Sequence, residues 1–308
     1  MTELESPIPQ LLMEYHGIDP PPGISIPTVS ELLSLCTEEH PWGYPMGLAY
    51  PADNPIFWIK YGGSVVPNEI FAQAMAYHEL RRLNSPVRAP GIFYACNVNH
   101  IKYIVMEYIS GRSGAQVLKD IDNLTGKEPI YRQIAFAISE LLRIPVKQSH
   151  PSAVNGEHIR HTLFDMEEAP RLYQTVEQLE QHLNGFLALT KCKARVQDLS
   201  REPLVFCHSD LHPGNFLIDQ DGHIVVIDFA DASILPSSFA KSALYFSADK
   251  FECNIIDWVD VPGMEGFNNL PALFAVAQKM VMRSSSFSKI GTKVPGFNID
   301  AQESINTV

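Results

Sequence analysis

The sequence predicts an α+β protein of two lobes, a small β-sheet lobe followed by a larger, mainly helical lobe. Two observations predict this fold class. Strand-like runs surround a single helix before Gly111, and helical periodicity dominates after it. A chain of 308 residues is long enough for both lobes. We expect an irregular N-terminal arm at residues 1–30, the sheet lobe at 31–108 and the helical lobe at 109–308.

The elements of the sheet lobe follow from local residue types. The prolines of residues 1–30 lack amide donors and favour an irregular arm. Residues 56–61 are β-branched and aromatic and predict a strand. A helix should run over residues 67–83, because a proline opens it and apolar residues recur there at helical spacing. Residues 92–95 and 102–109 predict a hairpin around a turn at Asn97-Val98-Asn99.

The helical lobe begins after Gly111. Apolar residues at helical spacing over residues 130–141 and 170–195 predict two long helical segments. Three strand-like runs follow, and the loop and tight turn between them predict one strand–loop–strand–turn–strand unit. These runs are Leu204 to Cys207, Phe216 to Ile218 and Ile224 to Ile227.

Composition excludes several classes of protein. With 45% hydrophobic and 19% charged residues, the chain is not wholly disordered. Its net charge of 23 − 35 = −12 disfavours binding to nucleic acid or to a membrane surface. No secretory signal, membrane-spanning run or CxxC pair is visible, and the five cysteines are scattered. We expect a cytoplasmic protein; the sequence does not predict its oligomeric state.

The most informative segment surrounds three polar residues. Asp210 and Asn215 lie in the loop between two predicted strands, and Asp228 ends the third strand. Because these strands should fold back on one another, the three side chains can converge. Carboxylate and amide oxygens suit Mg²⁺ with bound phosphates. A further carboxylate in the group can accept the proton of an attacking hydroxyl.

The H-x-D-x-x-x-x-N…I-D-F pattern of His208 to Phe229 resembles the aminoglycoside phosphotransferase family, which shares the protein-kinase-like fold with choline kinases. The resemblance extends from Ile56 to about Leu244. Residues 105–109 resemble the family's adenine-binding hinge, and the sequence I-V-M-E-Y-I-x-G around them resembles fungal members in particular.

This resemblance implies ATP and Mg²⁺ as cofactors and a role for each matching residue. Two acids on the helix at 67–83 can be the ion-pair partner of Lys60, and family spacing favours Glu69 over Glu79. His208 would brace the loop. The implied roles are Asp210 as catalytic base, Asn215 and Asp228 as Mg²⁺ ligands, Lys60 as the contact to the α- and β-phosphates, Glu69 as the residue that fixes Lys60, and Glu107 and Ile109 as backbone contacts to adenine.

The implied function is ATP-dependent transfer of the γ-phosphate to a hydroxyl of a small molecule. A cationic acceptor is compatible with the acids between Asp249 and Glu265, although these also suit a solvated face. One alternative is a catalytically silent nucleotide-binding protein of the same fold, because only Gly43 and Gly47 stand where a Gly-rich phosphate loop is expected. Another is a zinc-dependent hydrolase using His208-x-Asp210-x-His212.

Overall fold

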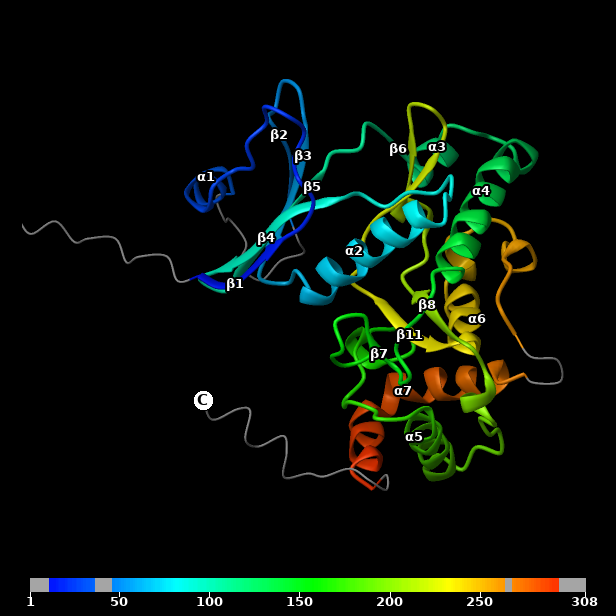
Figure 1. Ribbon diagram of the computed structural model, residues 1–308. Coiled ribbons are helices and arrows are strands. Elements are labelled where there is room, and N and C mark those ends of the chain that lie inside the picture. Colours follow the sequence, from blue (N-terminus) through cyan, green and yellow to red (C-terminus); the bar gives the residue numbers. More distant parts are fainter. Residues whose placement is uncertain (1–10, 37–45, 264–267, 294–308) are drawn as a thin grey trace, which may run out of the picture.

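The computed structural model describes residues 11–36, 46–263 and 268–293, and it confirms the predicted α+β, two-lobed, protein-kinase-like fold (Figure 1). One lobe is built on a five-stranded antiparallel sheet in the order β1-β4-β5-β3-β2. The other contains most of the helices and two three-stranded sheets, β10-β9-β6 and β7-β11-β8. In Figure 1, helix α2 lies between the large sheet and the second lobe.

The first lobe contains seven described elements. They are β1 (Leu11–His16), α1 (Val29–Leu35), β2 (Met46–Tyr50), β3 (Phe57–Gly62), α2 (Pro67–Arg82), β4 (Ile92–Val98) and β5 (Ile101–Glu107).

The second lobe contains strands, α-helices and short 3₁₀ helices. The strands are β6 (Gly111–Ser113), β7 (Ser152–Ala153), β8 (Leu204–His208), β9 (Phe216–Asp219), β10 (Ile224–Val226) and β11 (Ala232–Pro236). The α-helices are α3 (Gly114–Lys119), α4 (Leu124–Leu142), α5 (Val176–Leu189), α6 (Ser237–Phe246) and α7 (Leu270–Gly291). The 3₁₀ helices are η1 (Asp165–Glu167), η2 (Leu199–Arg201), η3 (Pro213–Asn215), η4 (Ala248–Lys250) and η5 (Ile256–Trp258).

The prediction of an irregular N-terminal arm is wrong at residues 11–16. Residues 11–16 form β1, which pairs with β4 at the edge of the sheet. The run Leu-Leu-Met-Glu-Tyr-His carries no proline, so every residue can join the ladder. Residues 17–28 do form no regular element, and residues 1–10 lie outside the described residues.

Alternation along β3 decides which way its lysine points. Phe57, Ile59 and Tyr61 are buried in a cluster on the face of the sheet that α1 covers. Because successive side chains of a strand point to opposite faces, Lys60 lies on the other face, the one that α2 covers. The sequence therefore places this amine beside the helix that carries Glu69.

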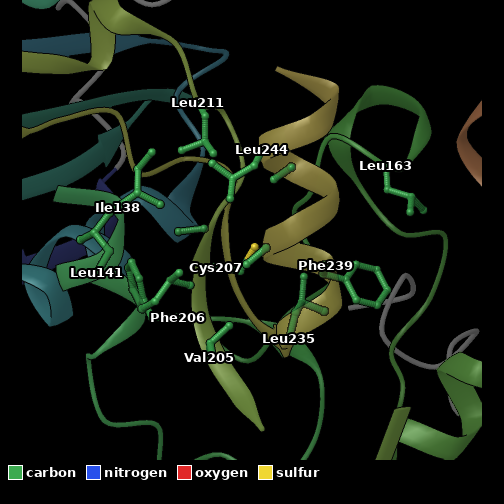
Figure 2. Close-up of a cluster of buried hydrophobic side chains, with 14 of the residues drawn as sticks. Ile138, Leu141, Leu163, Val205, Phe206, Cys207, Leu211, Leu235, Phe239 and Leu244 are labelled. Atoms are coloured by element: carbon green, nitrogen blue, oxygen red, sulfur yellow. The ribbon is translucent and has the colours of Figure 1, made fainter. Parts of the chain in front are cut away.

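The second lobe packs around β8. Figure 2 shows Phe206 directed toward Leu141 of α4, whereas the neighbouring Cys207 is directed toward α6. Both side chains are fully buried, as expected for a strand covered on both faces. This packing fixes the end of β8, from which the loop with Asp210 begins.

The predicted strand–loop–strand–turn–strand unit is wrong in its pairing. Strands β9 and β10 do form a hairpin, but β8 pairs with β11 and belongs to another sheet. Strand β11 is a buried run that the sequence analysis did not single out.

The turn predicted at Asn97-Val98-Asn99 is also misplaced. Strand β4 runs through Val98, and the residues in the left-handed conformation are Asn99 and His100. The helical segment predicted at 170–195 is the shorter α5.

Two buried histidines hold parts of the second lobe together. Nε2 of His161 lies 3.1 Å from the Phe239 carbonyl, and the N–H of Leu163 donates to its Nδ1. Nε2 of His182 lies 2.7 Å from the carbonyl of Phe287, and Tyr173 contacts its Nδ1. Each ring therefore donates once and accepts once, which only the neutral form can do. Burial lowers the pKa of both histidines to about 4.

We expect the free energy of unfolding to fall as the pH drops from about 6.5 to about 4. The unfolded chain binds protons to His161 and His182 in this range, whereas the folded chain does not, so acid favours unfolding. Each histidine should cost on the order of 3 kcal/mol across the range. Denaturant unfolding at several pH values measures the slope. His161→Gln should flatten it, the exposed His78→Gln should not, and equal slopes in all three proteins would contradict the assignment.

The described residues contain no helix that is both long and apolar enough to cross a membrane. All five cysteines lie in the described part of the chain, and all are free.

Candidate active site

The site centres on an amine held between two carboxylates from different lobes. Lys60 Nζ lies 2.7 and 2.8 Å from the carboxylate oxygens of Glu69 and 3.1 Å from Oδ1 of Asp228. Glu69 is therefore the partner of Lys60, and Glu79 pairs instead with Arg82. These contacts join β3, α2 and the segment after β10 at one point between the lobes.

Because the ion pair is buried, the charge of each member depends on the charge of the other. Burial acts to lower the pKa of Lys60, but the charges and hydrogen bonds of Glu69 and Asp228 raise it above its ordinary value. Lys60 therefore stays charged. Burial also raises the pKa of Glu69 to about 7, against the charge of Lys60. Removal of either partner would leave an uncompensated buried charge.

Helix α2 is tied to the second lobe by a buried amide next to Glu69. Nδ2 of Asn68 donates to the carbonyls of Ala230 (3.0 Å) and Ala232 (2.7 Å), and its Oδ1 accepts the N–H of Asn155 at 3.2 Å. Its exposed fraction is 1%. Because Ala230 follows Asp228 closely, this amide fixes the distance between Glu69 and Asp228 across the lobes.

Asn68→Ala should lower the free energy of unfolding by about 2–3 kcal/mol, because two carbonyls and one N–H lose their partner inside the protein. Denaturant titration measures the change. The same substitution at the exposed Asn54 is the control and should change stability by less than about 0.5 kcal/mol. Equal stability of the two variants would show that Asn68 does not tie the lobes together.

Asp228 is held by its neighbours in an unusual backbone conformation. Its φ of 60° lies in the left-handed region, which aspartate tolerates better than most residues. The N–H of Ile227 donates to the Asn215 carbonyl, and Nε2 of His208 lies 3.3 Å from the Ile227 carbonyl. Burial lowers the pKa of His208, so its ring is neutral. These are the contacts of a brace, as the sequence analysis expected of His208.

The loop after β8 positions Asp210 beside Asn215. Nδ2 of Asn215 donates to the backbone carbonyl of Asp210 (2.9 Å) and to its Oδ2 (3.0 Å). The other carboxylate oxygen, Oδ1, lies 3.1 Å from Nζ of Lys250. Burial acts to raise the pKa of Asp210, but Lys250 and Asn215 lower it below its ordinary value. Asp210 is therefore a carboxylate.

A cavity of about 480 Å³ lies between the lobes on the hinge side of Lys60. Glu107 and Ile109, the predicted adenine contacts, both line it. The N–H of Glu107 donates to the carbonyl of Gly91, which leaves only its carbonyl as a backbone group for a ligand. Arg88 holds the Glu107 carboxylate at 2.7 Å. The further lining residues that this site uses are Gly47, Trp58, Met106, Leu217, Ile227 and Asp228.

Part of the expected phosphate loop can be located. Gly47 lies in β2 and lines the same cavity, and a Cβ at this position would come within 2.3 Å of the Trp58 ring. Glycine is therefore needed for the close contact of β2 with this tryptophan. Gly43 lies outside the described residues.

A second cavity, of about 880 Å³, shares Lys60, Glu69 and Asp228 with the first and also contains Asp210. Its wall is rich in carboxylates. Besides the residues already named, they are Asp165, Glu167, Glu168 and Asp231. Arg160 offsets part of this charge, because its guanidinium bonds Asp231 at 2.8 Å and Glu168 at 3.1 Å.

The predicted zinc cluster does not form. Nε2 of His208 is directed to the Ile227 carbonyl, so His208 does not share a metal position with Asp210 and His212, whose Nε2 lies 3.9 Å from Oδ2 of Asp210. In residues 11–36, 46–263 and 268–293, only Asp219, Asp221 and His223 bring three metal-type ligands close together. Oδ1 of Asp219 accepts the N–H groups of the other two residues, as in an ordinary Asx turn.

The sequence analysis missed several residues that line or support the site. Arg160, Asp231 and Lys250 belong to segments without a recognisable motif, and only the three-dimensional contacts place them there. Gly111 was noted only as the residue that ends the hinge pattern, and it lines the hinge-side cavity.

The chain matches a family model described as the phosphotransferase enzyme family over residues 63–237, more than half of its 308 residues. All predicted site residues except Lys60 lie in this range. No curated protein sequence matches it.

Three solved structures illustrate the similarity. A thermostable mutant of aminoglycoside phosphotransferase APH(4)-Ia, apo form, has 12% identity and a TM-score of 0.45, over 83% of this chain and 96% of that one. The GDP and kanamycin complex of APH(2")-IIia has 13% identity and a TM-score of 0.44, over 91% and 98%. The AMP-bound complex of spectinomycin phosphotransferase APH(9)-Ia has 16% identity and a TM-score of 0.39, over 82% and 87%.

Proposed function

Because the chain belongs to the phosphotransferase enzyme family, we propose that it transfers the γ-phosphoryl group of ATP to a hydroxyl of a small molecule. One observation carries the proposal. The ion-paired Lys60 lies where two cavities meet, one lined by the hinge and the other containing the Asp210 carboxylate. This arrangement provides a nucleotide site and an acceptor site that share one amine.

The hinge-side cavity suits the nucleotide. Met106, Leu217 and Ile227 offer apolar surface to a base, while the carbonyl of Glu107 and the backbone of Ile109 offer hydrogen bonds to its edge. Lys60, at the inner end of the same cavity, would contact the α- and β-phosphates. We further propose that the chain is similar to fungal members of the family, and the hinge sequence alone supports this.

The side-chain oxygens of Asp228 and Asn215 are of a kind that fits Mg²⁺. Asp228 contributes a partly exposed carboxylate, and Asn215 contributes an amide whose nitrogen is already directed to Asp210. The remaining oxygens are hard ligands of the kind that Mg²⁺ prefers, so these two residues would hold the ion. When bound, Mg²⁺ would neutralise charge on the β- and γ-phosphates.

Asp210 then acts on the acceptor. Its carboxylate orients the acceptor hydroxyl and accepts its proton as the hydroxyl oxygen forms a bond to the γ-phosphorus. The bond between that phosphorus and the β–γ bridging oxygen breaks, and ADP leaves. Such a transition state needs positioning and charge stabilisation more than covalent help.

The charge of the second cavity favours a cationic acceptor. Besides Asp210 and the nucleotide-site residues, four carboxylates line it, and Arg160 is already bonded to two of them. Burial, and after it repulsion from neighbouring carboxylates, raises the pKa of Glu167 and of Asp231, so both disfavour the charged form. An amino-bearing hydroxyl compound would relieve this repulsion.

A labelled-phosphate screen tests the proposal. The protein is incubated with γ-labelled ATP, Mg²⁺ and a fractionated metabolite extract, and the labelled product is identified. We expect label in a hydroxyl compound that binds a cation exchanger before phosphorylation. The Asp210→Asn variant is the control and should give no product. ATP binding without transfer to any fraction, and without ATP hydrolysis that depends on Asp210, would instead favour a silent nucleotide-binding protein.

A further inference from the structure

Lys250 contacts the proposed catalytic carboxylate from a segment with no recognised motif. Its Nζ lies 3.1 Å from Oδ1 of Asp210, while Nδ2 of Asn215 lies 3.0 Å from Oδ2. The two oxygens of this carboxylate are therefore held by two different donors. Nε2 of His212, at 3.9 Å, is too far away to be a third.

The segment that carries Lys250 is anchored through the two residues that follow it. Phe251, 5% exposed, packs edge-on against the buried ring of Tyr131, with ring centroids 6.0 Å apart. The N–H of Glu252 donates to the Tyr131 hydroxyl at 3.3 Å, and its carboxylate pairs with Lys127 at 2.6 Å. The backbone at Lys250 is thus fixed against helix α4, and its side chain reaches Asp210 from a defined origin.

We propose that Lys250 is a positioning residue for the transfer reaction, which fixes the plane of the Asp210 carboxylate toward the acceptor hydroxyl. The proposal rests on the proposed function. The terminal torsion of an aspartate is broad, so one donor alone leaves the carboxylate free to turn. Two donors on separate oxygens define its plane and still leave lone pairs for the hydroxyl, since a carboxylate offers about four acceptor positions.

The consequence for the reaction is geometric. A hydroxyl attacks efficiently only when it is aligned with the phosphorus, and misplacement by about 1 Å can cost about 10²-fold in rate. The loss of Lys250 should therefore act on turnover and leave nucleotide binding unchanged, because the residue does not line the hinge-side cavity.

The test compares Lys250→Met, Lys250→Arg and the matched control Lys241→Met, a lysine of α6 outside both cavities. The assay is Mg²⁺-dependent ATP turnover, with the acceptor found in the screen or with water. We expect Lys250→Met to lower kcat by about 10- to 100-fold with KM for ATP unchanged. Lys250→Arg, which keeps a charged donor, should recover most of kcat, and Lys241→Met should match wild type.

Two results would overturn the inference while the proposed function stands. One is a wild-type kcat for Lys250→Met in an assay in which Asp210→Asn shows no turnover. The other is a Lys250→Met variant in which only KM for ATP changes. No Asp210-dependent turnover in the wild type would refute the proposed function and this inference with it. A crystal structure of Lys250→Met gives a measurement without turnover: a turned or disordered Asp210 carboxylate is expected, and an unchanged one contradicts the proposal.

Discussion

We expect phosphoryl transfer to fall by about 10²- to 10⁴-fold when Asp210 is replaced by asparagine, which is the usual contribution of a positioned general base. The substitution keeps nearly the same volume and removes only the charge that accepts the hydroxyl proton. The wild-type side chain is a carboxylate, because Lys250 and Asn215 hold its pKa below the ordinary value. Single-turnover transfer of label from ATP to the acceptor measures the effect.

Binding data separate this loss from damage to the nucleotide site. Asp210 lines the second cavity, where the acceptor is proposed to bind, and does not line the hinge-side cavity. The affinity of Asp210→Asn for ATP should therefore remain at the wild-type level. Transfer within a few-fold of wild type would remove Asp210 from its assigned role. A parallel loss of ATP affinity would show that the residue supports the nucleotide site instead.

Replacement of Asp228 by asparagine should lower transfer by about 10³-fold or more. Charge stabilisation by a metal at a transferring phosphoryl group contributes several kcal/mol, and each 1.36 kcal/mol is a factor of ten in rate. Asparagine is preferred to alanine here because the φ of 60° at this position is one that asparagine also tolerates. The backbone should therefore stay in place while the charged ligand is lost.

The dependence on Mg²⁺ identifies the cause of that loss. Asp228→Asn should need a much higher Mg²⁺ concentration for half-maximal turnover than the wild type. The matched control is Asp221→Asn, an exposed turn carboxylate whose loss should change neither turnover nor the Mg²⁺ requirement. A wild-type Mg²⁺ titration of Asp228→Asn would refute its assignment as a metal ligand.

Sequence analysis predicted the two lobes because local patterns determine them. The β-branched and aromatic residues at 56–61 and the helical spacing in residues 67–83 predicted β3 and α2, and strand alternation also directs Lys60 toward α2. It could not choose firmly between Glu69 and Glu79, since both lie on the same helix. That choice depends on which turn of α2 lies against β3, which is a property of packing.

The pairing of β8 was beyond local patterns. Its predicted neighbour was β9, the next strand along the chain, but the ladder forms with β11. Strand pairing over such a separation depends on which buried faces fit together. The residue types within each strand do not predict this pairing. Asp210 and Asp228 still line one cavity, because the Ile227 N–H bonds to the Asn215 carbonyl.

By itself, the sequence predicted which residues would carry the proposed chemistry, since the spacing of Asp210, Asn215 and Asp228 within one short stretch is a local property. Only the tertiary structure decided what surrounds them: the tie from Asn68 to the segment after Asp228, the acidic wall of the acceptor cavity and the contact from Lys250. The physical reason is distance along the chain. Short-range patterns follow from backbone geometry, whereas contacts between remote segments arise only when burial of apolar surface brings those segments together.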